Sequence, residues 1–277
     1  MAAFLVMAYA GIIAFELPTV RAQLDIGLPP DLSLWTALGH LFGSALPAFL
    51  VMAALHGRAG VRDLASRSLR WRVGARWYLF ALLGVPIAVV LCASVIFGLA
   101  PLNALVDKWP LLFTVMLPNL LLRIVFFNVI EEIGWTGFLQ ARLQDRHGPL
   151  KACVLVEIPF ALWHLPGLIG DTGELPLALV LLGVFAISQL FARVVIMWLY
   201  NNTNRSVLLV GLFHSAFNTT NNRFVGEFIP GLAEGAFLIV SGVVAVAAVL
   251  MVVFTRGRLS YKPNHVSQTA DAPLTKE

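Results

Sequence analysis

Eight apolar runs divide the chain, and several approach the roughly 20 residues that an α-helix needs to cross a bilayer. Of the 277 residues, 59% are hydrophobic and only 12% are charged, which is about half the charged share of an ordinary soluble domain. We therefore predict an all-α, polytopic integral membrane protein with about eight transmembrane helices. The expected spans are 2–17, 32–55, 77–99, 110–130 continuing as helix past residue 142, 151–169, 175–200, 206–222 and 231–254.

The two ends of the chain differ in character. No basic segment precedes the first apolar run and no small-residue cleavage site ends it, so we expect this run to remain as a helix. Residues 259–277 are polar and contain prolines, which is typical of a disordered tail. The sequence thus predicts a single transmembrane domain over residues 1–258 and a disordered cytosolic tail over 259–277.

Basic residues gather in three of the segments that border the spans. Because positively charged segments stay in the cytosol, the pattern predicts a cell-membrane protein with both termini cytosolic. The net charge of +4 then reflects membrane orientation, so we expect contacts with the lipid bilayer and none with nucleic acid. The basic residues are Arg58, Arg62, Arg67, Arg70, Arg72 and Arg76 in one segment, Arg142, Arg146 and Lys151 in another, and Arg256, Arg258 and Lys262 in the third.

Residues 60–77, between the second and third expected spans, are basic and partly apolar. Val61, Leu64, Ala65 and Leu69 recur at helical spacing, with arginines largely at the other positions. Such a segment can form an amphipathic helix that lies on the anionic cytosolic leaflet. A plain basic loop is the alternative that the loose spacing leaves open.

Five polar residues in the helices of the expected spans stand out. They are Glu131 and Glu132 in the fourth, His164 in the fifth, and His214 and Asn218 in the seventh. A charged group at the centre of a transmembrane helix costs about 2.5–3.5 kcal/mol, so each position is a functional candidate. Counted along the helices from their cytosolic ends, the five can converge in one layer. The pattern therefore predicts an intramembrane polar cavity.

Helical geometry separates the roles of these residues. Neighbouring residues on a helix point about 100° apart, whereas residues four apart share a face. Glu131 and Glu132 must therefore face different partners. His214 and Asn218 share a face, so both can address one centre.

A carboxylate, two imidazoles and a carboxamide in an apolar cavity are the groups that water-mediated acyl hydrolysis needs. A carboxylate and an imidazole can exchange protons with water, and an imidazole and an amide N–H can stabilise an oxyanion. No serine or cysteine in the cluster has a comparably placed base, which makes a covalent mechanism the less attractive alternative. Phe160, one turn before His164, is either a substrate-binding wall of the pocket or simple core.

At these residues the sequence resembles the CAAX-processing and bacteriocin-processing family of membrane proteases, also called the CPBP or Abi family. The segment "EEIGWTGFLQARL" corresponds to the family's EExxxR motif, "FALWH" to FxxxH and "HSAFN" to HxxxN/D. The motifs occur in the family's order on separate spans, and the resemblance covers about residues 61–222.

The resemblance implies an eight-helix intramembrane endopeptidase that opens toward the cytosol. Its substrate would be a peptide bond near a membrane-embedded or lipidated end, such as that of a prenylated CaaX protein. Glu131 and His164 would activate the hydrolytic water, and His214 and Asn218 would stabilise the oxyanion. Glu131, His164 and His214 are also candidate ligands for Zn²⁺, with water at an open fourth position, and the sequence leaves metal dependence open.

One position departs from the family pattern, because Thr136 stands where the family has arginine. An arginine there would pair with Glu132 one turn earlier, whereas threonine offers only a hydroxyl. Glu132 must then be protonated, accept a hydrogen bond from Asn128, or pair across helices, and Arg193 is our candidate for that partner. Arg193 is also a candidate substrate contact, but a tie between helices is the simpler interpretation.

Two other functions stay open. A transporter or proton pathway also uses Glu and His within spans, but it predicts a polar path to both membrane faces and internal repeats, which the sequence lacks. A non-catalytic scaffold or immunity protein of the same family is the second, and Thr136 is its best support.

Glu157 is expected near the cytosolic end, and His40, His56 and His147 at the membrane interface without partners.

Overall fold

The computed structural model describes residues 1–26, 34–229, 231–232 and 234–263. These residues form helices and turns, with no strand among them. The α-helices are α1 (Ala2–Ile26), α2 (Leu34–His40), α3 (Leu46–Ser68), α4 (Ala75–Phe97), α5 (Ala100–Asp107), α6 (Leu117–Arg123), α7 (Val129–Glu132), α8 (Ala141–His147), α9 (Pro149–Trp163), α10 (Leu165–Thr172), α11 (Leu175–Asn202), α12 (Val207–Thr219), α13 (Val225–Phe228) and α14 (Ala236–Phe254). Short π-helical turns join several of them: η1 (Leu41–Ala45), η2 (Leu112–Met116), η3 (Ile124–Asn128), η4 (Ile133–Gln140) and η5 (Thr220–Phe224).

Several helices have the length and composition of membrane spans, which confirms the predicted all-α, multi-pass fold. The first expected span coincides with a shorter apolar helix, Ala2–Glu16, and the seventh with α12, of 13 residues. In the described part of the chain the count is five, or six if α9 and α10, bent by 42° at their junction, cross together. The number eight therefore stays a prediction. The five helices are Thr36–Ser68, Ala75–Phe97, Leu112–His147, Leu175–Asn202 and Ala236–Phe254.

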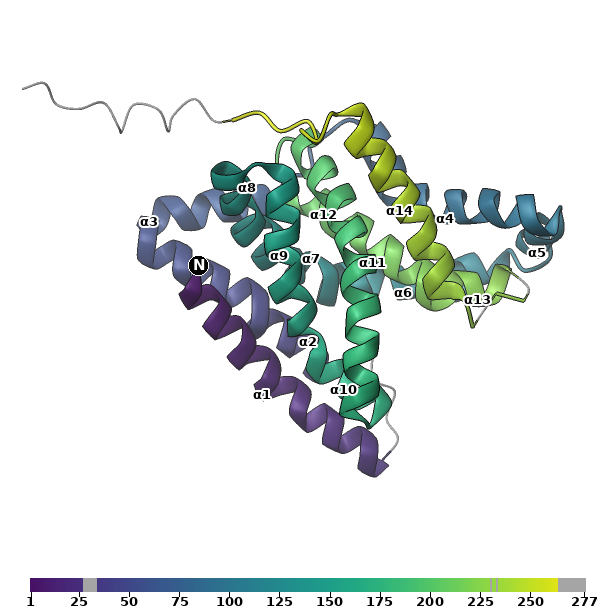
Figure 1. Ribbon diagram of the computed structural model, residues 1–277, viewed down its shortest axis with the longest axis horizontal. Coiled ribbons are helices and arrows are strands. Elements are labelled where there is room, and N and C mark those ends of the chain that lie inside the picture. Colours follow the sequence, from purple (N-terminus) through teal and green to yellow (C-terminus); the bar gives the residue numbers. More distant parts are fainter. Residues whose placement is uncertain (27–33, 230, 233, 264–277) are drawn as a thin grey trace, which may run out of the picture.

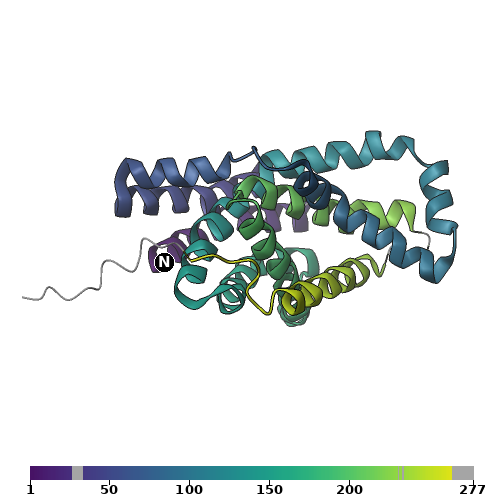
Figure 2. The same ribbon diagram turned by 90° about the horizontal axis from the view of Figure 1, so that it is seen from above.

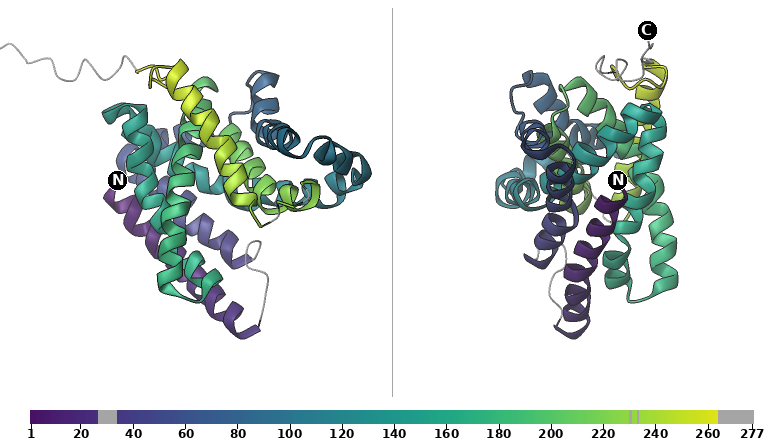
Figure 3. Two further views of the ribbon diagram at one scale, coloured as in Figure 1. Left: turned by 45° about the vertical axis from the view of Figure 1, so that its right-hand side comes forward. Right: turned by 90° about the vertical axis from the view of Figure 1, so that its left-hand side faces the viewer.

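α12 lies near the centre of the bundle, where it packs against α4, α7 and α11 (Figure 1). α11 also contacts α9 and α14. α1 runs beside α2 and α10, and Figure 3 shows α1 and the α10–α11 corner extending together away from the other helices. α5 projects at the end of the molecule opposite the N-terminus (Figure 2). The helices that carry the sequence motifs, α7, α9 and α12, thus meet inside the bundle.

Two glycines allow close helix contacts at this centre. A Cβ atom at Gly134 would lie 2.7 Å from the backbone oxygen of Ser44, and one at Gly211 would lie 2.8 Å from Cα of Val129. Small residues are common at helix contacts in membranes, because van der Waals packing takes over there from the hydrophobic effect. Gly134 therefore lets η4 approach η1, and Gly211 lets α12 approach α7.

The basic segment after the second span is only partly the helix predicted over residues 60–77. α3 continues to Ser68 beyond a kink at Gly57, whose φ of 58° is left-handed, but residues 69–74 are not helical. Arg67 is buried instead of facing lipid headgroups. Its guanidinium donates to the carbonyl of Gly137 at 2.7 Å and to the hydroxyl of Tyr200 at 2.8 Å. Arg67 therefore ties α3 to η4 and α11.

Ordered contacts continue past the last helix. Leu259 is buried, and its carbonyl accepts a hydrogen bond from Asn201 at 3.0 Å. Tyr261 donates to Asp145 at 2.8 Å, and burial together with this carboxylate raises the pKa of Tyr261 to about 12, so the hydroxyl stays a donor at neutral pH. Of the predicted tail, residues 264–277 lie outside the described residues.

Candidate active site

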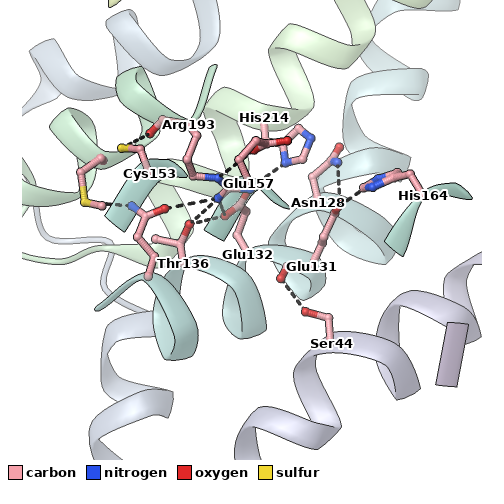
Figure 4. Close-up of polar contacts among 12 residues, drawn as sticks. Ser44, Asn128, Glu131, Glu132, Thr136, Cys153, Glu157, His164, Arg193 and His214 are labelled. Carbon is pink, nitrogen blue, oxygen red and sulfur yellow. Dashed lines mark hydrogen bonds and ion pairs between the residues drawn. The ribbon is translucent and has the colours of Figure 1, made fainter. Parts of the chain in front are cut away.

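Glu131 and Glu132 lie in an irregular stretch of the helix Leu112–His147. The four-residue α7 that carries them is flanked by two π-helical turns, η3 and η4. Such turns disturb the regular backbone ladder and are frequent at functional sites. Here the hydroxyl of Ser44 donates to the backbone carbonyl of Glu131 at 2.6 Å. The two carboxylates reach different partners, as the sequence predicts (Figure 4).

Glu131 is only 1% exposed and faces two imidazoles. Its Oε1 lies 3.5 Å from Nε2 of His164, and its Oε2 lies 3.6 Å from Nε2 of His40. The amide of Asn128 donates to Oε2 at 3.4 Å. These contacts are longer than ordinary hydrogen bonds, and Oε1 has no hydrogen-bond partner among the described residues. Contacts of this length between polar groups suit a bridging water molecule.

Backbone carbonyls fix the orientation of both imidazoles. Nδ1 of His164 lies 2.9 Å from the carbonyl oxygen of Phe160, and Nδ1 of His40 lies 2.8 Å from that of Thr36. A carbonyl oxygen can only accept, so each Nδ1 carries a proton. In the neutral form of each ring, Nε2 therefore turns a lone pair toward Glu131.

Glu132 faces a different set of partners and is fully buried. Its Oε2 accepts hydrogen bonds from Arg193 at 3.2 Å and from the hydroxyl of Thr136. Its Oε1 lies 2.9 Å from Nδ1 of His214. Arg193 also donates to the hydroxyl of Thr136 at 3.1 Å (Figure 4). The predicted partner across helices is thus present, and α11 supplies the positive charge that Thr136 does not.

Arg193 joins further groups behind the cavity wall. Its Nε lies 3.8 Å from Oε2 of Glu157, and its guanidinium lies 4.6 Å from the ring centroid of Phe160. Glu157 is buried against Arg193, so its side chain does not reach water. Arg193 is therefore a link between helices that holds Glu132, and through Glu132 it holds His214.

A cavity of about 490 Å³ brings most of the predicted residues together. Glu132 and Arg193 are not among the residues that line it, so the geometry supports the tie between helices rather than substrate contact by Arg193. Those that do line the cavity are Glu131, His164, His214, Asn218 and Phe160, joined by His40 and by Glu16, which the sequence did not single out.

The cavity opens on the side away from the basic segments. Among its lining residues only Asp171, near the end of α10, and Asn222, in η5, are exposed. The basic segments lie at the other ends of the helices. One runs from the second half of α3 to the start of α4, one from α8 to the start of α9, and one follows α14. The basic residues predict that these segments are cytosolic, and the family resemblance implies that the cavity opens to the cytosol. Because the segments and the opening lie on opposite sides, only one of these two expectations can hold.

His40 is the residue that sequence reasoning misses. The sequence places it at the membrane interface without a partner, which is wrong, because its side chain is 13% exposed and faces Glu131. The contact joins α2 to α7, so the spacing of residues along either helix does not predict it. The one available signal is that His40 lies inside an expected span, where a polar group carries the same cost as the other candidates.

The predicted zinc ligands do not come together. Nδ1 of His214 is engaged by Glu132 and not by Glu131. Over the described ranges, no group of three or more His, Cys, Asp or Glu side chains is placed to hold a metal ion. The described residues therefore do not fit the predicted metal centre.

The fold and this cavity define a multi-pass membrane protein with a buried acid–base centre. Residues 113–220 match the family model described as Type II CAAX prenyl endopeptidase Rce1-like. Over 130 residues the chain is 25% identical to CAAX prenyl protease 2 of Methanococcus maripaludis, a match that covers 46% of this chain and 46% of the relative. The chain thus spans about half the length of this curated relative. Both matches support the resemblance that the three motifs indicate.

Proposed function

We propose that the protein is a CAAX-type intramembrane endopeptidase, which hydrolyses a peptide bond near a membrane-embedded or lipidated segment of its substrate. The observation that carries the proposal is the buried Glu131 carboxylate, whose two oxygens face the Nε2 atoms of His164 and His40 in the cavity. The Rce1-like match over residues 113–220 supports the same chemistry.

The reaction begins with a water molecule between Oε1 of Glu131 and Nε2 of His164. Glu131 accepts a proton from this water while its oxygen attacks the scissile carbonyl carbon. The oxyanion that forms is stabilised by His214 and Asn218, which line the cavity together. The C–N bond then breaks, and the carboxyl of Glu131 returns the proton to the leaving nitrogen.

Water is the nucleophile best supported by the lining. Among the described residues that form the cavity there is neither a serine nor a cysteine. Several walls are aromatic, including Phe160, Phe185 and Trp163, which suits an apolar or lipidated peptide end.

The two alternatives lose their main support. The scaffold reading rests on the missing arginine at Thr136, but Arg193 brings a guanidinium to 3.2 Å from Glu132. The transporter reading requires a polar path to both faces, whereas the exposed lining residues, Asp171 and Asn222, both lie away from the basic segments.

A comparison of peptide termini tests the proposed activity. Membranes that contain the wild type are expected to show new protein or peptide termini that are missing from membranes with equal amounts of a Glu131→Gln variant. Mass spectrometry of the termini identifies the substrate and the bond. Identical termini in the two membranes, with any cellular phenotype retained by the variant, would contradict proteolysis and favour the scaffold.

Cysteine labelling tests the side on which the cavity opens. In a chain whose Cys92 and Cys153 are replaced by alanine, Asp171→Cys is expected to react with a membrane-impermeant maleimide added outside intact cells, because the positive-inside rule holds the basic segments in the cytosol. Arg62→Cys, on the opposite side, should react only after permeabilisation. The reverse pattern would give the cavity the cytosolic opening that the family resemblance implies.

A further inference from the structure

His40 and His164 are arranged alike around Glu131. Each is anchored through Nδ1 to the backbone carbonyl four residues earlier, at 2.8 Å for His40 and 2.9 Å for His164. Each directs Nε2 at a different oxygen of the same carboxylate, at 3.6 and 3.5 Å. His40 packs edge-on against the rings of Phe127 and Trp163, with centroids 5.6 and 5.2 Å away, so its ring is fixed on both sides.

A second carboxylate stands behind His40. Glu16 of α1 is 9% exposed and lines the same cavity. Its Oε1 lies 3.7 Å from where a Cβ atom would stand on Gly39, next to His40. Its carboxyl accepts a hydrogen bond from the hydroxyl of Thr36, one turn before His40, and its charge lies near His40. Glu16 and His40 therefore line the same cavity as Glu131.

We infer that His40 forms a proton-transfer branch of the active site beside Glu131, and that Glu16 positions His40. The inference rests on the proposed hydrolysis and adds to it two residues from α1 and α2, which lie outside the matched segment 113–220. The ionisable groups that face His40 are Glu16 from α1, Glu131 from α7 and His164 at the α9–α10 junction.

The proton balance is simple. Glu131 receives one proton from the attacking water, and once this proton lies on Oε2 the carboxyl passes it to Nε2 of His40. When the C–N bond breaks, the same proton moves back from His40 through Glu131 to the leaving nitrogen, so the starting protonation state is restored. The Glu16 carboxylate stabilises the positive charge of His40 while it carries the proton. His40 thus gives and takes a proton with the reacting carboxylate, and Glu16 acts on His40 as a positioning residue.

Steady-state kinetics of the purified full-length protein in detergent tests this branch. The probe is an internally quenched peptide that ends in a farnesylated Cys, two aliphatic residues and a free carboxyl terminus. His40→Gln is expected to lower kcat by about 10²-fold, to leave KM within about twofold, and to remove one ionisation from the pH profile of kcat. Gln keeps polar atoms at this position but does not titrate between pH 5 and 9. His56→Gln, an exposed histidine of α3 outside the cavity, should match the wild type.

A double variant separates proton transfer from mere packing. Glu16→Gln is expected to lower kcat by a smaller factor than His40→Gln, and Glu16→Gln added to His40→Gln should cause no further loss, because Glu16 acts only through His40. Additive losses, or a pH profile of His40→Gln that keeps every limb of the wild type, would overturn the inference. If His40→Gln does not fold, the test rests on Glu16→Gln alone. A Glu16→Gln variant with the kcat and the pH profile of the wild type would then overturn the inference.

The same assay distinguishes failure of this inference from failure of the proposed function. A wild type that cleaves while Glu131→Gln does not, together with a normal His40→Gln, rejects only the proton branch. A probe that the wild type cleaves no faster than Glu131→Gln rejects the hydrolysis, and with it the branch.

Discussion

Replacing Glu131 by glutamine is expected to lower kcat for the farnesylated peptide by about 10³-fold, within the range that a positioned general base contributes. Glutamine has nearly the same shape as glutamate, but its amide cannot take the proton of the attacking water. The bond from Ser44 to the backbone carbonyl of residue 131 does not depend on the side chain. The variant should therefore fold, and its KM should change little, since the substrate still fills the same cavity.

The control for Glu131→Gln is Glu234→Gln, which removes an exposed carboxylate outside the residues that line the cavity. Initial rates over a substrate series separate kcat from KM, and thermal unfolding in the same detergent reports folding. A Glu131→Gln variant that is folded and keeps more than a tenth of the wild-type kcat would show that another group activates the water.

Removing the charge of Arg193 is expected to have the largest effect on stability. Arg193→Gln leaves the fully buried Glu132 without its charged partner, and loss of one member of a buried ion pair costs about 3–5 kcal/mol. His214 depends on the same carboxylate through a 2.9 Å contact, so kcat should fall as well. The measurement is equilibrium unfolding in mixed micelles with a titrated denaturing detergent.

A pair of further variants shows whether charge is the cause. Arg193→Gln combined with Glu132→Gln removes both charges of this ion pair and should recover part of the lost stability, but not the activity, because His214 then lacks its carboxylate. Arg205→Gln, which removes a partly exposed pair with Asp145, is the control and should cost less than about 1 kcal/mol. A loss below about 1 kcal/mol in Arg193→Gln would mean that Glu132 does not need this arginine.

Much of the site can be predicted because its local geometry follows from helix periodicity. The separation of Glu131 from Glu132 and the shared face of His214 and Asn218 both follow from about 100° per residue, and the structure agrees with both. The cost of polar groups within spans also marks the right helices. These arguments use only neighbours along one helix, and this is where they succeed.

Contacts between helices are predicted only in part. The pairing of Arg193 with Glu132 is predicted, because the buried carboxylate lacks a charged partner on its own helix. The contact of His40 with Glu131 is not, because it depends on the way α2 packs against η3, and the residue spacing along either helix does not show it. The two predictions about the sides of the membrane conflict for a related reason. Counting residues from helix ends gives depth, but it does not say on which side Asp171 and Asn222 leave the wall open.

The two π-helical turns around α7 make the candidate site sensitive to the number of residues in this stretch of chain, as well as to its side chains. A π turn holds one residue more than an α turn, so a deletion of a single residue in η3 or η4 can be absorbed as a regular helix with the hydrogen-bond ladder intact. The helix on one side of the deletion would then rotate by about 100° against the other. Glu131 would turn away from its imidazoles without any loss of helix, and the result would be a folded membrane protein with no acid–base centre.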